Sequence, residues 1–139
     1  MKNTSSVGTI KQLIVHWAKT SPLPVIAVYG FGSFFKRQTH VQSDIDVGVL
    51  FSKPLSNVKR FELQEQLAKK CGRNIDLVDL RKTTPVMAVQ IISEGTILYC
   101  SDETDKNTFE TFIYSAYARF NEERKDIIND ILKRGSIHG

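Results

Sequence analysis

Hydrophobic positions follow two spacings along the chain, and each spacing predicts a different element. Ile10, Leu13, Ile14 and Trp17 recur every three or four residues, which is typical of an amphipathic helix. The short apolar run 25–29 is rich in β-branched residues and predicts a buried strand. By these criteria we expect helices over about 7–19, 56–71, 84–93 and 107–133, and strands over about 25–29, 43–51, 74–80 and 96–100.

Prolines and glycines fall between these segments. Pro22 and Pro24 end the first helix, because proline lacks a backbone donor and restricts the residue before it. Gly72 stands where a helix C-terminal cap belongs, and Gly95 stops the helix before the last strand. The resulting order alternates helices and strands, with a short turn or helix after residue 29, and predicts one α/β unit.

Several of the predicted helices carry apolar residues that we expect to contact the core. The expected core positions in helix 56–71 are Val58, Phe61, Leu63, Leu67 and Ala68. The last helix carries an apolar stripe made of Phe109, Phe112, Ile113, Ala116, Phe120, Ile127, Ile128 and Ile131. Tyr114 and Tyr117 lie within the same helix, and packing, or docking against a partner helix, would explain them.

Length and composition exclude several classes of protein. At 139 residues we expect a single domain, 1–139, with a core at about 23–100 and a C-terminal helix at about 107–134. No apolar run reaches the roughly 20 residues that a membrane span needs. The net charge of +4 favours polyanionic partners, though the basic residues are scattered. Two cysteines without CxxC spacing favour reduced thiols and a cytoplasmic protein.

The candidate chemistry lies in Gly32 and Ser33, followed after ten residues by Asp44 and Asp46. Side chains alternate along a strand, so the two aspartates share one face and can share a cation. Mg²⁺ binds through one or two carboxylates plus substrate phosphates. Gly32 leaves room for a phosphate, and Ser33 offers a hydroxyl and an N–H. The alternative is an exposed turn with two solvated aspartates, which is less favoured because the surrounding strand is apolar.

These residues resemble the signature of the polymerase β-type nucleotidyltransferase superfamily. The motif consists of Gly32-Ser33, the ten-residue spacer and the run 43–50, Ser-Asp-Ile-Asp-Val-Gly-Val-Leu. The short chain, the run 75–81 and the C-terminal helix are similar to the minimal nucleotidyltransferase (MNT) group. Within that group they resemble the MntA-type antitoxins of HEPN/MNT toxin–antitoxin systems. The resemblance covers most of the chain and is looser at the C-terminus.

The resemblance implies a polymerase β-like α/β domain with a small mixed sheet, flanking helices and a long C-terminal helix. It implies Mg²⁺ and ATP as co-substrate, and transfer of AMP to a tyrosine of a HEPN-domain RNase toxin. The toxin would also be a complex partner, and no direct DNA binding is expected. By resemblance Gly32 and Ser33 bind the triphosphate, Asp44 and Asp46 hold the metal ions, and a third carboxylate is a ligand or general base.

Two assignments stay open within this pattern. Asp76 and Asp79 lie on opposite faces of one strand, so only one can face the site, and the family pattern favours Asp76. Many family members have Gly-Ser-x-Ala-Arg-Gly, whereas this chain reads Gly-Ser-Phe-Phe-Lys-Arg-Gln, so either Lys36 or Arg37 is expected at the triphosphate.

The leading hypothesis is therefore a protein adenylylyltransferase acting as an antitoxin. One alternative is an antitoxin that acts by complex formation with little catalysis. Another is transfer to a small molecule such as an aminoglycoside, although 139 residues leave little room for a second substrate-binding domain.

Overall fold

The computed structural model describes residues 6–37 and 44–138, with backbone only for residue 37 and residues 135–138. The elements, in chain order, are α1 (Val7–Thr20), β1 (Val25–Phe31), α2 (Gly32–Arg37), β2 (Ile45–Phe51), α3 (Asn57–Cys71), β3 (Ile75–Asp79), α4 (Pro85–Glu94), β4 (Thr96–Cys100) and α5 (Glu103–His138). The predicted order is confirmed, and the last helix begins earlier and ends later than the apolar pattern indicated.

Local sequence explains where most helices begin and end. The side chains of Ser6, Ser56 and Thr84 accept hydrogen bonds from backbone N–H groups in the first turns of α1, α3 and α4. Pro85 opens α4, where its missing N–H costs nothing. Gly72 caps α3 in the left-handed conformation with φ of 66°, as expected from its position.

The four strands form one mixed sheet in the order β3-β2-β1-β4. β1 pairs antiparallel with both β2 and β4, whereas β2 and β3 are parallel. This topology brings the end of β1 and the starts of β2, β3 and β4 to one edge of the sheet. Residues that end or begin these strands are therefore neighbours although they are far apart in sequence.

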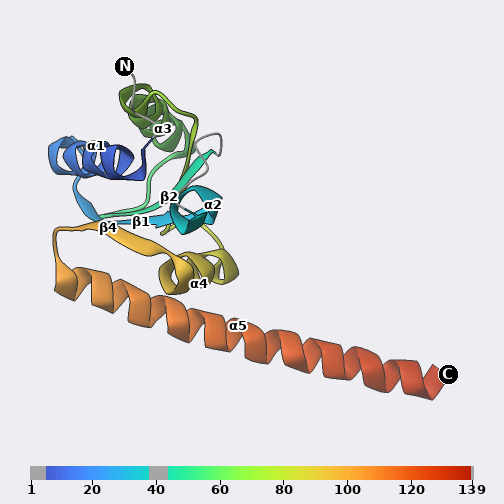
Figure 1. The fold of residues 1–139 in the computed structure, drawn as a ribbon. Coiled ribbons are helices and arrows are strands. Elements are labelled where there is room, and N and C mark those ends of the chain that lie inside the picture. Colours follow the sequence, from blue (N-terminus) through green and yellow to red (C-terminus); the bar gives the residue numbers. More distant parts are fainter. Residues whose placement is uncertain (1–5, 38–43, 139) are drawn as a thin grey trace.

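Helices cover both faces of the sheet (Figure 1), with α1 and α3 on one face and α4 and α5 on the other. The alternation predicted for β2 is confirmed. Ile45, Val47 and Val49 are buried with residues of α1 and α3, whereas Leu50 is buried with residues of α4 and α5. The two cores fix the register of β2, because a shift by one residue would exchange its two faces.

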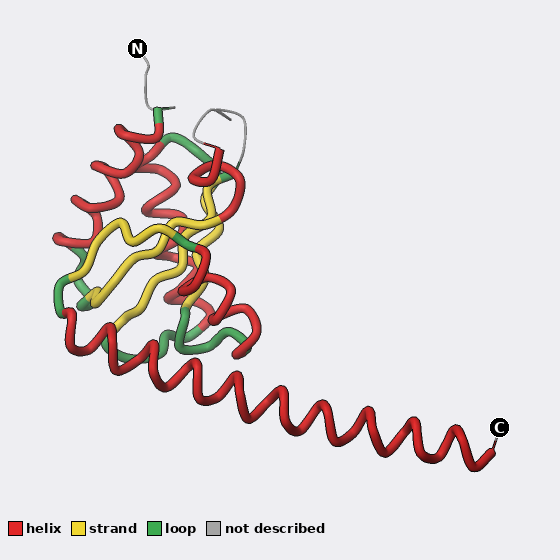
Figure 2. The backbone as a smooth tube through the Cα atoms, turned by 60° about the horizontal axis from the view of Figure 1, so that its bottom comes forward, coloured by secondary structure: helices red, strands yellow, loops and turns green. Residues whose placement is uncertain are grey.

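The expectation that Val58 and Phe61 of α3 contact the core is wrong. Val58 and Phe61 of α3 are 69% and 53% exposed, because only Leu63, Leu67 and Cys71 of this helix are buried. Among the described side chains of α5, the buried apolar ones are Phe109 and Ile113, and the helix then projects away from the sheet (Figure 2). Among the described helices, none combines the length and the apolar character needed to cross a membrane.

Candidate active site

The sheet edge described above carries the predicted carboxylates. Asp46, the second residue of β2, pairs with Phe31 of β1, and its parallel neighbour in β3 is Asp76. Asp44 is exposed just before β2. Side chains of paired residues lie on the same face of a sheet, so Asp46 and Asp76 face the same side. The fold thus places Asp76 next to Asp46 across two parallel strands, and Asp44 lies in the chain just before the start of β2.

Asp46 is partly buried at the start of β2. Its pKa lies above the ordinary value, first because burial removes water and then because Asp76 and Asp44 repel its charge. None of the ion pairs between described side chains involves Asp44, Asp46 or Asp76. The site therefore concentrates negative charge that a bound cation would neutralise.

Gly32 packs directly against this carboxylate. Its φ of +81° is a left-handed conformation that L residues with a side chain rarely adopt. A Cβ atom at this position would lie only 2.3 Å from Asp46 Oδ2. Glycine is required here both by the backbone turn between β1 and α2 and by the closeness of the aspartate.

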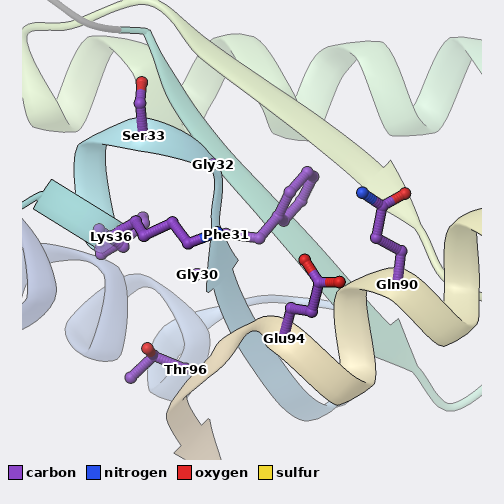
Figure 3. A pocket seen from close by; sticks show the side chains of 9 residues that line it. Gly30, Phe31, Gly32, Ser33, Lys36, Gln90, Glu94 and Thr96 are labelled. Atoms are coloured by element: carbon purple, nitrogen blue, oxygen red, sulfur yellow. The ribbon is translucent and has the colours of Figure 1, made fainter.

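The other predicted phosphate-binding residues surround a pocket of about 550 Å³ (Figure 3). Ser33 and Lys36 of α2 line it together with Gly32. The side chain of Arg37 lies outside the described part of the chain, as does the spacer 38–43. Lys36 thus lies at the pocket, and the choice between Lys36 and Arg37 at the triphosphate stays a prediction.

Six residues that the sequence did not single out also line this pocket, namely Gly30, Phe31, Phe35, Gln90, Glu94 and Thr96. Phe31 ends β1, Gln90 and Glu94 belong to the last turns of α4, and Thr96 begins β4. Thr96 pairs with Gly30 of β1, which places the end of α4 beside the phosphate-binding turn. This arrangement follows from the pairing of β4 with β1, which no local motif in the sequence reports.

Asp79, the alternative candidate for the third carboxylate, accepts hydrogen bonds from the backbone. It is only 3% exposed, and its two oxygens accept hydrogen bonds from the backbone N–H groups of Leu55 (2.9 Å) and Arg81 (3.0 Å). The bond from Leu55 ties the end of β3 to the loop that precedes α3, and the bond from Arg81 holds the turn that follows β3. Asp79 faces away from Asp46, as its parity predicted, and its partners are backbone groups rather than the side chain of a basic residue.

The donor set suits a hard divalent cation. Carboxylate oxygens are the ligands that Mg²⁺ prefers, and their mutual repulsion is relieved by a positive ion. Among the described residues, no three acidic, histidine or cysteine side chains already converge as ligands of one ion. An ion held by Asp44, Asp46 and Asp76 would therefore complete its shell with water and substrate oxygens, which is how Mg²⁺ is usually bound.

Comparisons with known proteins agree with this geometry. The model of the family "Polymerase beta, Nucleotidyltransferase" matches residues 12–104. The protein adenylyltransferase MntA of Shewanella oneidensis is 35% identical over 105 residues, which cover 76% of this chain and 75% of that protein.

Solved structures of toxin–antitoxin complexes are similar to this chain over a larger part of its length. A crystal structure of a toxin–antitoxin with AMP-PNP has a TM-score of 0.76 and 31% identity, covering 88% of this chain and 98% of that one. A structure of tri-AMPylated Shewanella oneidensis HEPN toxin in complex with MNT antitoxin matches with a TM-score of 0.73 and 30% identity, covering 90% and 98% of the two chains. This chain therefore belongs to the polymerase β nucleotidyltransferase family, in the group of the MntA-type protein adenylyltransferases.

Proposed function

We propose that this chain is an antitoxin that transfers AMP from ATP to a tyrosine of a cognate HEPN RNase toxin. The observation that carries the proposal is the row formed by Phe31, Asp46 and Asp76 beside the Gly32 turn. It combines a carboxylate cluster with a phosphate-binding turn at one sheet edge. An ATP-dependent reaction on an RNase belongs in the cytoplasm.

In the proposed reaction the phenolic oxygen of the tyrosine attacks the α-phosphorus of ATP. A new O–P bond forms, the bond to the β-phosphate oxygen breaks, pyrophosphate leaves and the phenolic proton is released. Gly32, Ser33 and Lys36 hold the triphosphate, and Asp76 is either a third metal ligand or the group that takes the proton. Mg²⁺ held by Asp44 and Asp46 would neutralise the charge that develops on the transferred phosphate.

A protein acceptor is favoured by the projecting half of α5. There Ile127, Ile128, Ile131 and Leu132, which we term the C-terminal apolar stripe, are between 48% and 65% exposed. Contiguous exposed apolar residues mark protein–protein interaction sites. Relatives of similar length have been solved as MntA–HepT toxin–antitoxin complexes, so the stripe suits a toxin as partner. A complex of the two proteins follows from this proposal.

The direct test uses purified chain, the cognate toxin, Mg²⁺ and ATP labelled at the α-phosphate. Asp44→Ala and Asp46→Ala should each lower label incorporation into the toxin by at least about 100-fold, because charge neutralisation at the phosphate contributes several kcal/mol. Asp105→Ala is a matched control, since this exposed aspartate lies in the first turn of α5. Normal labelling by either site variant would contradict the mechanism.

The same variants separate catalysis from binding. If the Asp44→Ala/Asp46→Ala double variant still inhibits the toxin at equal concentration, the chain acts by complex formation instead. Transfer of label to an aminoglycoside but not to the toxin would support a small-molecule acceptor.

A further inference from the structure

The pocket beside the phosphate-binding turn has two chemically different ends. On the α2 side it is lined by Ser33, which has a hydroxyl, and by the cationic Lys36. On the α4 side it is lined by Gln90, Glu94 and Thr96, none of which is cationic. Its volume of about 550 Å³ falls within the range of nucleotide-sized ligand sites. Phosphates suit the first end, and a different part of the ligand must occupy the second.

Gln90 and Glu94 are four residues apart and therefore lie on one face of α4. Figure 3 shows both side chains extending from α4 on the side where the Phe31 ring lies, whereas Ser33 extends away from α4. Neither side chain has a hydrogen bond or ion pair with any other described residue. Their polar groups are therefore available to a ligand.

The α4 end of the pocket is held firmly against the phosphate-binding turn. The Gly95 N–H donates to Ile91 O at 2.8 Å and closes α4 directly after Glu94. A Cβ atom on Gly95 would lie 2.5 Å from Ile91 O and 3.0 Å from Gly30 O, so the backbone of Gly95 lies directly against β1. Thr96 then pairs with Gly30. The position of Glu94 relative to Gly32 is thus fixed by backbone contacts.

The charge of Glu94 decides which part of a nucleotide can lie beside it. An ionised carboxylate only accepts hydrogen bonds and repels phosphate oxygens. The sugar hydroxyls of a nucleotide are neutral donors, and acidic side chains bind ribose in this way at other nucleotide sites. Because Gly32 lines the pocket and also contacts Asp46, a nucleotide whose α-phosphate lies at the carboxylates can place its sugar towards α4.

We infer that Glu94, assisted by Gln90, binds the ribose hydroxyls of the nucleotide, so that the site selects ribonucleoside triphosphates. This inference rests on the proposed function for the presence of ATP in the pocket. It adds α4 to the substrate-binding elements of the site and gives the two exposed polar residues of its last turns a role.

The experiment measures equilibrium binding of ATP and of 2′,3′-dideoxyATP by calorimetry in the presence of Mg²⁺. The unmodified chain should bind ATP at least about tenfold more tightly, because hydrogen bonds to a charged acceptor are among the strong ones. Glu94→Ala should lose this preference by weakening ATP alone, and Glu94→Gln should retain part of it. Glu65→Ala, an exposed glutamate of α3, is the matched control and should leave the preference unchanged.

Three results would overturn the inference. The unmodified chain could bind both nucleotides equally well, or Glu94→Ala could weaken the binding of both nucleotides equally. Glu94→Ala could also keep the preference for ATP and lower only the kcat of AMP transfer. The last result would place Glu94 at the acceptor. If ATP is preferred as expected but no AMP reaches the toxin, the ribose site stands and the proposed acceptor is wrong. The two failures are therefore distinguishable.

Discussion

Asp46 lies half-buried between two other carboxylates, and each of these conditions disfavours its ionised form. Keeping that charge at neutral pH costs folding free energy. The arrangement is useful only if a cation compensates the charge. The same repulsion that destabilises the metal-free protein therefore strengthens the binding of a divalent ion.

We predict that Asp46→Asn stabilises the metal-free protein at neutral pH. The folded-state pKa of Asp46 is raised, so the unmodified chain loses stability as pH rises from the ordinary aspartate value through this raised pKa. At pH 3 both proteins are neutral at this position and their melting temperatures should converge. Thermal unfolding in EDTA at pH 3 and pH 7 tests this, and a variant that melts at or below the unmodified chain at pH 7 would contradict it.

Asp76 and Asp79 are separated by two residues and should respond differently to the same substitution. Asp76→Asn should change the free energy of unfolding by less than about 0.5 kcal/mol, because the side chain is exposed, and should reduce AMP transfer strongly. Asp79→Asn should cost about 2 kcal/mol, because a buried carboxylate that accepts two backbone hydrogen bonds is replaced by an amide. Urea unfolding and the labelling assay check both. Equal loss of stability in the two variants would contradict the assignment.

At the scale of elements, the turn from β1 to α2 joins the phosphate-binding residues to the carboxylates. Gly32→Ala should cost about 1–2 kcal/mol, because alanine disfavours the left-handed conformation. Its Cβ would also push Asp46 out of place, so AMP transfer should fall by at least about tenfold. Gly8→Ala is the matched control, since nothing lies within 4 Å of a Cβ there. If both variants keep full activity, the close contact between Gly32 and Asp46 is unimportant.

Some of the site could be predicted because it depends on local periodicity. The alternation along β2 places Asp46 and Gly48 on the face opposite to Ile45, and the sheet keeps that alternation. That Gly32 leaves room for a phosphate stays a prediction. The structure adds a second reason for glycine that the sequence did not indicate, because a Cβ atom there would lie 2.3 Å from Asp46 Oδ2.

Other parts of the site depend on which strands pair, and sequence patterns do not report that. Glu94 and Thr96 reach the phosphate-binding turn only because β4 pairs with β1. For the same reason the apolar residues of α3 and α5 could be recognised as stripes, but the sequence did not indicate which of them a neighbouring element covers. Val58 and Phe61 are exposed because only one side of α3 contacts the sheet layer.

The whole molecule consists of a sheet domain and one helix that extends well beyond it (Figure 1). α5 has 36 residues and is therefore about 54 Å long. In its first part, the side chains of Phe109 and Ile113 are buried against the domain. Ile127 and Ile131 lie 18 residues after Phe109 and Ile113, respectively. Because 18 residues make five full turns at 3.6 residues per turn, all four lie on the same face of the helix. The face that packs on the domain thus continues, uncovered by any described residue, as the C-terminal apolar stripe.

We predict that a charge in the C-terminal apolar stripe separates toxin binding from nucleotide binding. Ile131→Asp should weaken the complex with the toxin by at least about tenfold, because a buried unpaired carboxylate is costly at an interface. Asn129→Asp introduces the same side chain two residues away, on the opposite side of the helix, and should leave the affinity unchanged. Calorimetry with toxin and with ATP measures both affinities, and ATP binding should be equal in all three proteins because the stripe is far along α5 from the pocket. Unchanged toxin affinity in Ile131→Asp would contradict the prediction. So would a dimer of this chain, detected by gel filtration, that only Ile131→Asp dissociates, because the stripe would then join two copies of the chain instead of binding the toxin.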